Sequence, residues 1–117
     1  MSKKHKYFFK CPMFDFKVIL VLQDRELLKP YGIADKPDQD WYRGELWQDT
    51  DGRFIVWVAD PADYYTMVHE ALHLATKILD RLGIIYTGDN DEILAHYQNY
   101  WVQQFWHKMS PFAGKEK

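Results

Sequence analysis

Residues 60–83, DPADYYTMVHEALHLATKILDRLG, have the clearest secondary-structure pattern in this chain. Asp60 is suited to cap the N-terminus of a helix, Pro61 suits the first helical position, and Asp63 stands where a capping-box carboxylate belongs. Apolar side chains recur at helical spacing as far as Leu82, and the glycine that follows favours a left-handed stop. The stretch predicts one long helix, apolar over much of its circumference, at the centre of the core.

The segments before this helix have the patterns of β-strands. Residues 14–22 alternate between two faces, which is typical of a strand. Residues 44–48 and 53–59 flank an Asp-Gly turn and predict a hairpin, and the second run is apolar on both faces, so we expect helices to cover it. Residues 23–29 predict a short helical turn, and residues 31–43 a loop.

A second helix is expected from residue 89 or 90 to Lys108, ended by Ser110 and Pro111. The elements together predict an α+β fold, in which a small, mostly antiparallel sheet of about three strands packs on two helices. Residues 1–117 are expected to form a single domain, with residues 1–10 as a flexible or basic tail.

The composition excludes several classes of protein. Of the 117 residues, 47% are hydrophobic, which is typical of a folded chain and not of a disordered one. The net charge of -2 gives no electrostatic reason to expect nucleic acid or an anionic membrane as a partner. The single cysteine allows no intrachain disulfide, and neither a signal peptide nor a membrane span is recognisable, so we expect a cytoplasmic protein.

The central helix carries a metal-binding pattern, His69-Glu70-Ala71-Leu72-His73. Residues four apart share one face of a helix, so His69 and His73 can direct two imidazole nitrogens at one metal ion. Zinc favours such ligands and leaves a position for water when the protein supplies three. Glu70 can reach that water without binding the metal, as a general base must. The pattern therefore predicts a zinc site with Glu70 as the catalytic base.

The motif, together with Glu92 on the next helix, resembles the zincin metallopeptidases whose third ligand is a downstream glutamate. Residues 68–106 are similar to the short zincin-like metallopeptidases encoded by phages and prophages, and less closely to the compact peptidases that cleave phage repressors. The resemblance implies a zincin-like fold and zinc as cofactor. It also implies His69, His73 and Glu92 as metal ligands and Glu70 as the base of a hydrolase that cleaves a peptide bond.

The third ligand has alternatives. If Asp89 caps the second helix, Glu92 falls at the third helical position, where a capping-box glutamate belongs. His96 or Asp91 would then be the ligand. If Glu92 binds the metal, His96 stands four residues later, where thermolysin-like enzymes have an aspartate that orients a zinc-binding histidine, and would support a ligand in the same way. Tyr97 and Tyr100 are the candidates for stabilising an oxyanion.

The expected partner is a peptide or protein substrate, such as a host protein, with no membrane involved. In zincins the substrate lies extended along an edge strand, which here predicts residues 53–59 or the neighbouring strand. The alternative function is that of a non-catalytic binding protein with a zincin fold, a phage-type factor that contacts a host protein while zinc is structural or absent. A purely structural helical hairpin would bind no metal.

Overall fold

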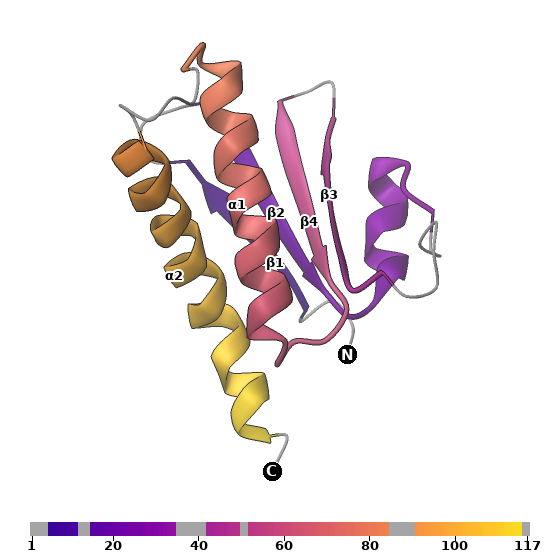
Figure 1. Ribbon diagram of the computed structural model, residues 1–117. Coiled ribbons are helices and arrows are strands. Elements are labelled where there is room, and N and C mark those ends of the chain that lie inside the picture. The colour runs from indigo at the N-terminus through magenta and orange to yellow at the C-terminus, as the bar shows by residue number, and fades with distance from the viewer. Residues whose placement is uncertain (1–4, 12–14, 35–41, 50–51, 85–90, 116–117) are drawn as a thin grey trace.

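The computed structural model of the chain describes residues 5–11, 15–34, 42–49, 52–84 and 91–115 (Figure 1). The elements in chain order are β1 (Lys6–Lys10), β2 (Lys17–Leu22), the 3-10 helix η2 (Arg25–Tyr31), β3 (Gly44–Gln48), β4 (Arg53–Val58), α1 (Tyr64–Arg81) and α2 (Asp91–Lys115). None of the helices in these ranges has the length and apolar character of a membrane span.

The four strands form one mixed sheet in the order β1-β2-β4-β3. The pairs β1–β2 and β4–β3 are antiparallel, whereas the central pair β2–β4 is parallel. The α+β class expected from the sequence is confirmed, and so is the hairpin of β3 and β4. The sheet has one strand more than expected and one parallel pair at its centre. Its edges are therefore β1 and β3.

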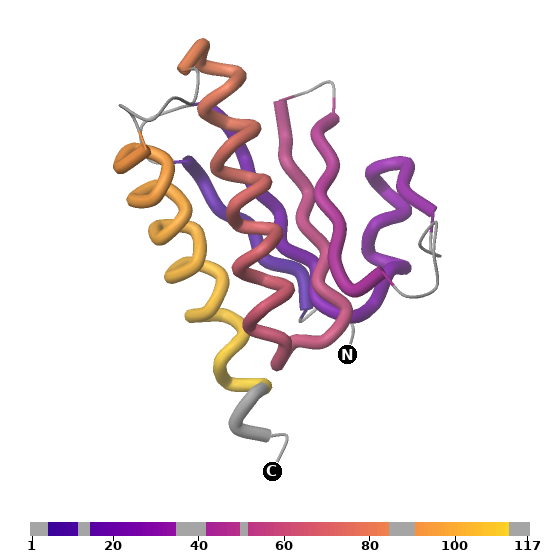
Figure 2. Tube along the Cα trace, viewed as in Figure 1, coloured from indigo at the N-terminus to yellow at the C-terminus, as the bar shows by residue number. Residues whose placement is uncertain are grey.

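Both faces of β4 are covered along most of its length, as its apolar character predicted. Val56 faces the cluster formed with α1 and α2, whereas Ile55 and Trp57 face the cluster formed with η2. Figure 1 shows α1 and α2 side by side over the sheet, running in opposite directions, and the tube in Figure 2 follows the same path. Since α1 packs on β4 and β3 and against α2, its position is fixed by burial along most of its length.

The helix α1 begins three residues later than expected. Its N-cap is Asp63, whose carboxylate accepts hydrogen bonds from the backbone N–H of Thr66 (3.1 Å) and from the Thr66 hydroxyl (2.6 Å). Asp60 accepts instead from the backbone N–H of Ala62 (2.9 Å), so it stabilises the turn before the helix. The prediction of Asp60 as the cap was wrong for that reason. The left-handed glycine after the helix is confirmed, since Gly83 has φ of 80°.

The structure corrects two further expectations at the ends of the chain. Residues 6–10, expected to be part of a tail, form the edge strand β1, because Phe9 packs against Trp101 (6.1 Å between ring centroids) and Phe105 (5.5 Å) of α2. The helix α2 does not end before Pro111 but continues to Lys115. Phe112 packs on the core and lies edge-on to the ring of His5 (4.9 Å), and this packing outweighs the preference of proline to end a helix.

Candidate functional site

The two histidines of the motif lie together on the exposed side of α1. The Nε2 atoms of His69 and His73 are 3.1 Å apart, and the ring planes meet at 78°. Two imidazole nitrogens bound to one tetrahedral zinc, each at about 2.0–2.1 Å, lie roughly 3.3 Å from each other. The distance between the two nitrogens therefore fits two coordination positions of a single zinc ion. Without metal, the same distance allows an N–H···N hydrogen bond between the rings.

The surroundings of His73 favour its neutral, metal-binding form. Partial burial lowers the pKa of its imidazole, and the nearby His69 and Lys77 lower it further. A histidine must be neutral to offer a lone pair to a metal. The ring is therefore ready to bind a cation at a lower pH than an ordinary exposed histidine would be.

Glu70 points from α1 toward the start of β3 and is only 6% exposed. Its side chain lies so close to Gly44 that a Cβ atom there would be 3.1 Å from both Cγ and Oε2 of the glutamate, and 2.6 Å from Cγ2 of Thr66. Only glycine lets the strand approach the helix this closely. The absence of a side chain at Gly44 thus leaves room for the carboxyl group of Glu70 between the helix and the strand.

Burial at this place raises the pKa of Glu70 to about 7, and the negative charge of Glu45 contributes to the rise. Glu45 is itself held by Arg25, whose guanidinium lies 2.6 Å from its carboxylate. A carboxyl group that titrates near neutral pH can both accept and release a proton under physiological conditions. The environment of Glu70 is therefore suited to proton transfer.

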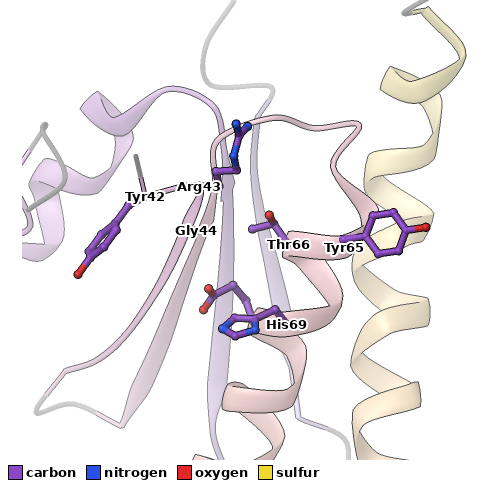
Figure 3. A pocket seen from close by; sticks show the side chains of 7 residues that line it. Tyr42, Arg43, Gly44, Tyr65, Thr66 and His69 are labelled. Atoms are coloured by element: carbon purple, nitrogen blue, oxygen red, sulfur yellow. The ribbon is translucent and has the colours of Figure 1, made fainter. Parts of the chain in front are cut away.

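Glu70 and His69 line a hollow of about 540 Å³ between the first half of α1 and the start of β3, together with Tyr42, Arg43, Gly44, Tyr65 and Thr66 (Figure 3). Figure 3 shows the His69 ring on the side of α1 that faces β3, with Thr66 one turn earlier on that side. The strand beside the hollow is β3, which forms the edge of the sheet. Residues 53–58 are paired on both sides, so of the two strands considered for an extended substrate only β3 has an edge.

The expected third ligands on α2 are not brought to the histidine pair. Glu92 and His96 are exposed, and each lies nine residues before a core residue of α2, Trp101 and Phe105 respectively. At about 100° per residue, nine residues correspond to opposite faces of a helix. Among the described residues, no three His, Cys, Asp or Glu side chains, Asp91 included, form a group that could hold a metal. Asp89, on which the capping role of Glu92 depended, lies outside the described residues.

The two tyrosines considered as oxyanion stabilisers lie elsewhere. The Tyr97 hydroxyl is 2.7 Å from the sulfur of Cys11, the residue that follows β1, and its ring stacks with Tyr100 (6.3 Å). Burial raises the pKa of both phenols. Since β1 and β3 are opposite edges of the sheet, these tyrosines are remote from the hollow beside β3.

The sequence pattern missed the β3 side of the site. Tyr42, Gly44 and Thr66 line the hollow because β3 packs beside α1, a long-range contact that no local pattern records. Comparison of the chain with protein-family models, characterised proteins and solved structures found no match. The resemblance to the zincins therefore depends on the motif and remains a prediction.

Proposed function

We propose that this chain is a zinc-dependent peptide hydrolase of the zincin type, in which His69 and His73 hold the metal and Glu70 is the general base. One observation supports this most: two imidazole nitrogens 3.1 Å apart stand next to a buried carboxyl group at a hollow beside an edge strand. A zinc ion held there would supply a Lewis acid that makes water nucleophilic near neutral pH.

The role of Glu70 follows from its position. Its carboxyl group is packed against Gly44 and Thr66, so its orientation is restricted before any substrate binds. A base held in this way can accept a proton from the attacking water through a carboxylate oxygen and then deliver it to the departing amine. Preorganisation of this kind lowers the barrier because the group does not have to be ordered during the reaction.

The edge of β3 is where we expect the substrate. An extended peptide can add to an edge strand through backbone hydrogen bonds, with alternate side chains entering neighbouring hollows. The hollow of about 540 Å³ opens at the start of β3, beside His69 and Glu70. A peptide paired with this strand would therefore carry its backbone past both groups.

One observation favours the second candidate, a binding protein without catalysis. Catalytic zinc sites usually have three protein ligands, whereas Glu92 and His96 are exposed on α2 and form no metal-ligating group with the histidine pair among the described residues. A two-histidine site holds zinc less firmly, which would suit a protein that acts only by contact. Neither Glu92 nor His96 is supported as a third ligand by the arrangement of the described residues.

The substitution Glu70→Gln separates the two candidates. Zinc-loaded wild type, Glu70→Gln and the surface control Glu26→Gln would be incubated with a mixed peptide library, and the cleavage products identified by mass spectrometry. We expect zinc-dependent cleavage that Glu70→Gln lowers by about 10²–10⁴-fold at unchanged zinc content, while Glu26→Gln cleaves normally. Wild type that cleaves nothing with zinc bound would contradict the hydrolase. Cleavage by Glu70→Gln at the wild-type rate would exclude Glu70 as the base.

A further inference from the structure

The sheet face turned away from α1 and α2 carries three cations side by side. Lys10 of β1 stands directly opposite Lys17 of β2, which stands directly opposite Arg53 of β4. Directly opposed residues of neighbouring strands point to the same face of the sheet. Lys17 points to the same face as Ile19, two residues later, and Ile19 packs in the cluster formed with η2. Like charges in such positions destabilise a sheet. This row of three cations therefore does not stabilise the sheet, which is consistent with a binding role.

Protection of the sheet edge explains only part of this row. Lysines on edge strands discourage aggregation, which accounts for Lys10, but Lys17 and Arg53 lie on the two central strands. The Arg53 guanidinium is held by Asp49 through Nε and Nη2, both at 2.7 Å, and Asp15 lines an adjoining hollow with Lys17. In the part of the chain that the structure describes, Lys10 and Lys17 form no ion pair, so they supply the uncompensated charge.

A hollow of about 580 Å³ adjoins this row and has aromatic walls. Phe8, which is 70% exposed, and Tyr31 of η2 both line it, and Ile19 forms an apolar part of the lining. The ammonium of Lys6 lies 4.7 Å from the centroid of the Tyr31 ring and 5.4 Å from that of Phe8, and the Arg53 guanidinium lies 5.2 Å from the Tyr31 ring. An apolar, ring-lined hollow thus borders directly on a group of cations.

We propose that this face binds a nucleoside phosphate. The phosphate would lie against the ammonium groups of Lys10 and Lys17, with the Asp49-bound guanidinium of Arg53 beside them. The base would stack on Phe8, because exposed aromatic rings beside cations are the usual platform for single-stranded bases. Phe8 lies two residues from Lys10 along the strand, about 7 Å, a distance that a ribose spans. The net charge of -2 does not reveal this site, because the cations are concentrated locally.

The ligand has two possible sources with the same chemistry, a free nucleotide or one unit of a single-stranded nucleic acid. Lys6 stands on the same face of β1, four residues from Lys10, where it could meet a second phosphate of a strand. The face is opposite to the one on which α1 carries His69 and Glu70, so this proposal is independent of the hydrolase.

The test uses the full chain with two probes, AMP and a fluorescein-labelled octathymidylate, and an acidic peptide of similar charge as comparison. Lys17→Gln removes one charge of the row and Phe8→Ala removes the exposed ring. As control, Arg81→Gln removes an exposed charge from the end of α1. Circular dichroism would confirm that each variant folds. Binding would be followed by fluorescence anisotropy for the oligonucleotide and calorimetry for AMP.

We expect Lys17→Gln and Phe8→Ala each to weaken binding about tenfold, and Arg81→Gln less than about twofold. Lys17→Gln should also reduce the slope of log affinity against log salt concentration by about 1. AMP binding that depends on both residues would support a free nucleotide, and binding of the oligonucleotide alone would support a nucleic acid. Absence of binding to both probes, or an acidic peptide that binds as tightly as they do, would overturn the proposal. So would loss in Lys17→Gln without loss in Phe8→Ala.

Discussion

The substitution Gly44→Ala tests the close approach of β3 to α1 that positions Glu70. The added Cβ would lie 2.6 Å from Cγ2 of Thr66 and 3.1 Å from Cγ of Glu70, whereas carbon atoms in contact lie about 3.5–4.0 Å apart. Thr66 cannot rotate its methyl group away freely, because its hydroxyl is bonded to Asp63 (2.6 Å). Either this side-chain hydrogen bond is lost or the strand moves away from the helix. Overpacking of this kind lowers the free energy of unfolding by about 1–3 kcal/mol.

A second substitution, Thr66→Ser, allows a double-mutant cycle with Gly44→Ala. Thr66→Ser removes the obstructing methyl group but keeps the hydroxyl that donates to the N-cap residue Asp63, so alone it should lower stability by less than about 1 kcal/mol. Combined with Gly44→Ala, it should restore at least half of the lost stability; the remaining loss comes from the contact with Glu70. Urea unfolding followed by tryptophan fluorescence measures all four proteins. A Gly44→Ala variant as stable as wild type, or a double variant no better than Gly44→Ala, would refute the close approach.

Further substitutions probe the ionisation of Glu70, the third ligand and the role of Tyr97. In the presence of a chelator, Glu70→Gln should raise the free energy of unfolding at pH 8–9. The pKa of Glu70 in the folded protein, about 7, exceeds the reference value of 4.5. The stability that the neutral carboxyl group contributes is therefore complete below pH 4.5 and is lost as the pH rises through 7. Because the hollow beside Glu70 is open to water, we expect a gain of about 1–2 kcal/mol rather than the ~3 kcal/mol that corresponds to the full pKa shift. Equal stability of the two proteins in urea at both pH 4.5 and pH 9 would contradict the buried position of Glu70. Glu92→Gln and His96→Ala should each change the zinc affinity, measured by competition with a chromogenic chelator, less than about threefold, because among the described residues neither side chain forms a metal-ligating group with the histidine pair. A loss above about tenfold for one of them would identify it as a ligand. Tyr97→Phe should lower stability by about 1 kcal/mol through loss of the contact with Cys11 and leave cleavage unchanged, and a selective loss of turnover would restore its role at an oxyanion.

The parts of the fold that local patterns determine were predictable. The Asp-Gly turn indicated the hairpin of β3 and β4, and Gly83 indicated the end of α1. The helical spacing of His69 and His73 was sufficient to place their rings together. These features depend on neighbours within a few positions, where chain geometry allows little choice.

The rest depends on contacts between distant segments. The strand β1 has lysines at both ends and follows a basic run, which favoured a tail over the strand preference of its three aromatic residues. The packing of Phe9 on α2 orders it. Spacing along the chain likewise does not fix the rotation of α2, which is decided by the burial of Trp101 and Phe105 and leaves Glu92 exposed. The need for glycine at position 44 follows from the close packing of β3 against α1, which the sequence around Gly44 does not indicate.

The most direct test of the zinc site is the zinc content of the purified chain, measured by elemental analysis after zinc is offered and the excess removed. We predict about one zinc per chain in wild type and in the control His107→Ala, and loss of the metal in both His69→Ala and His73→Ala. Well below half an equivalent in wild type would contradict the site. So would a dependence on only one of the two histidines, because the helix would then not present them as a pair.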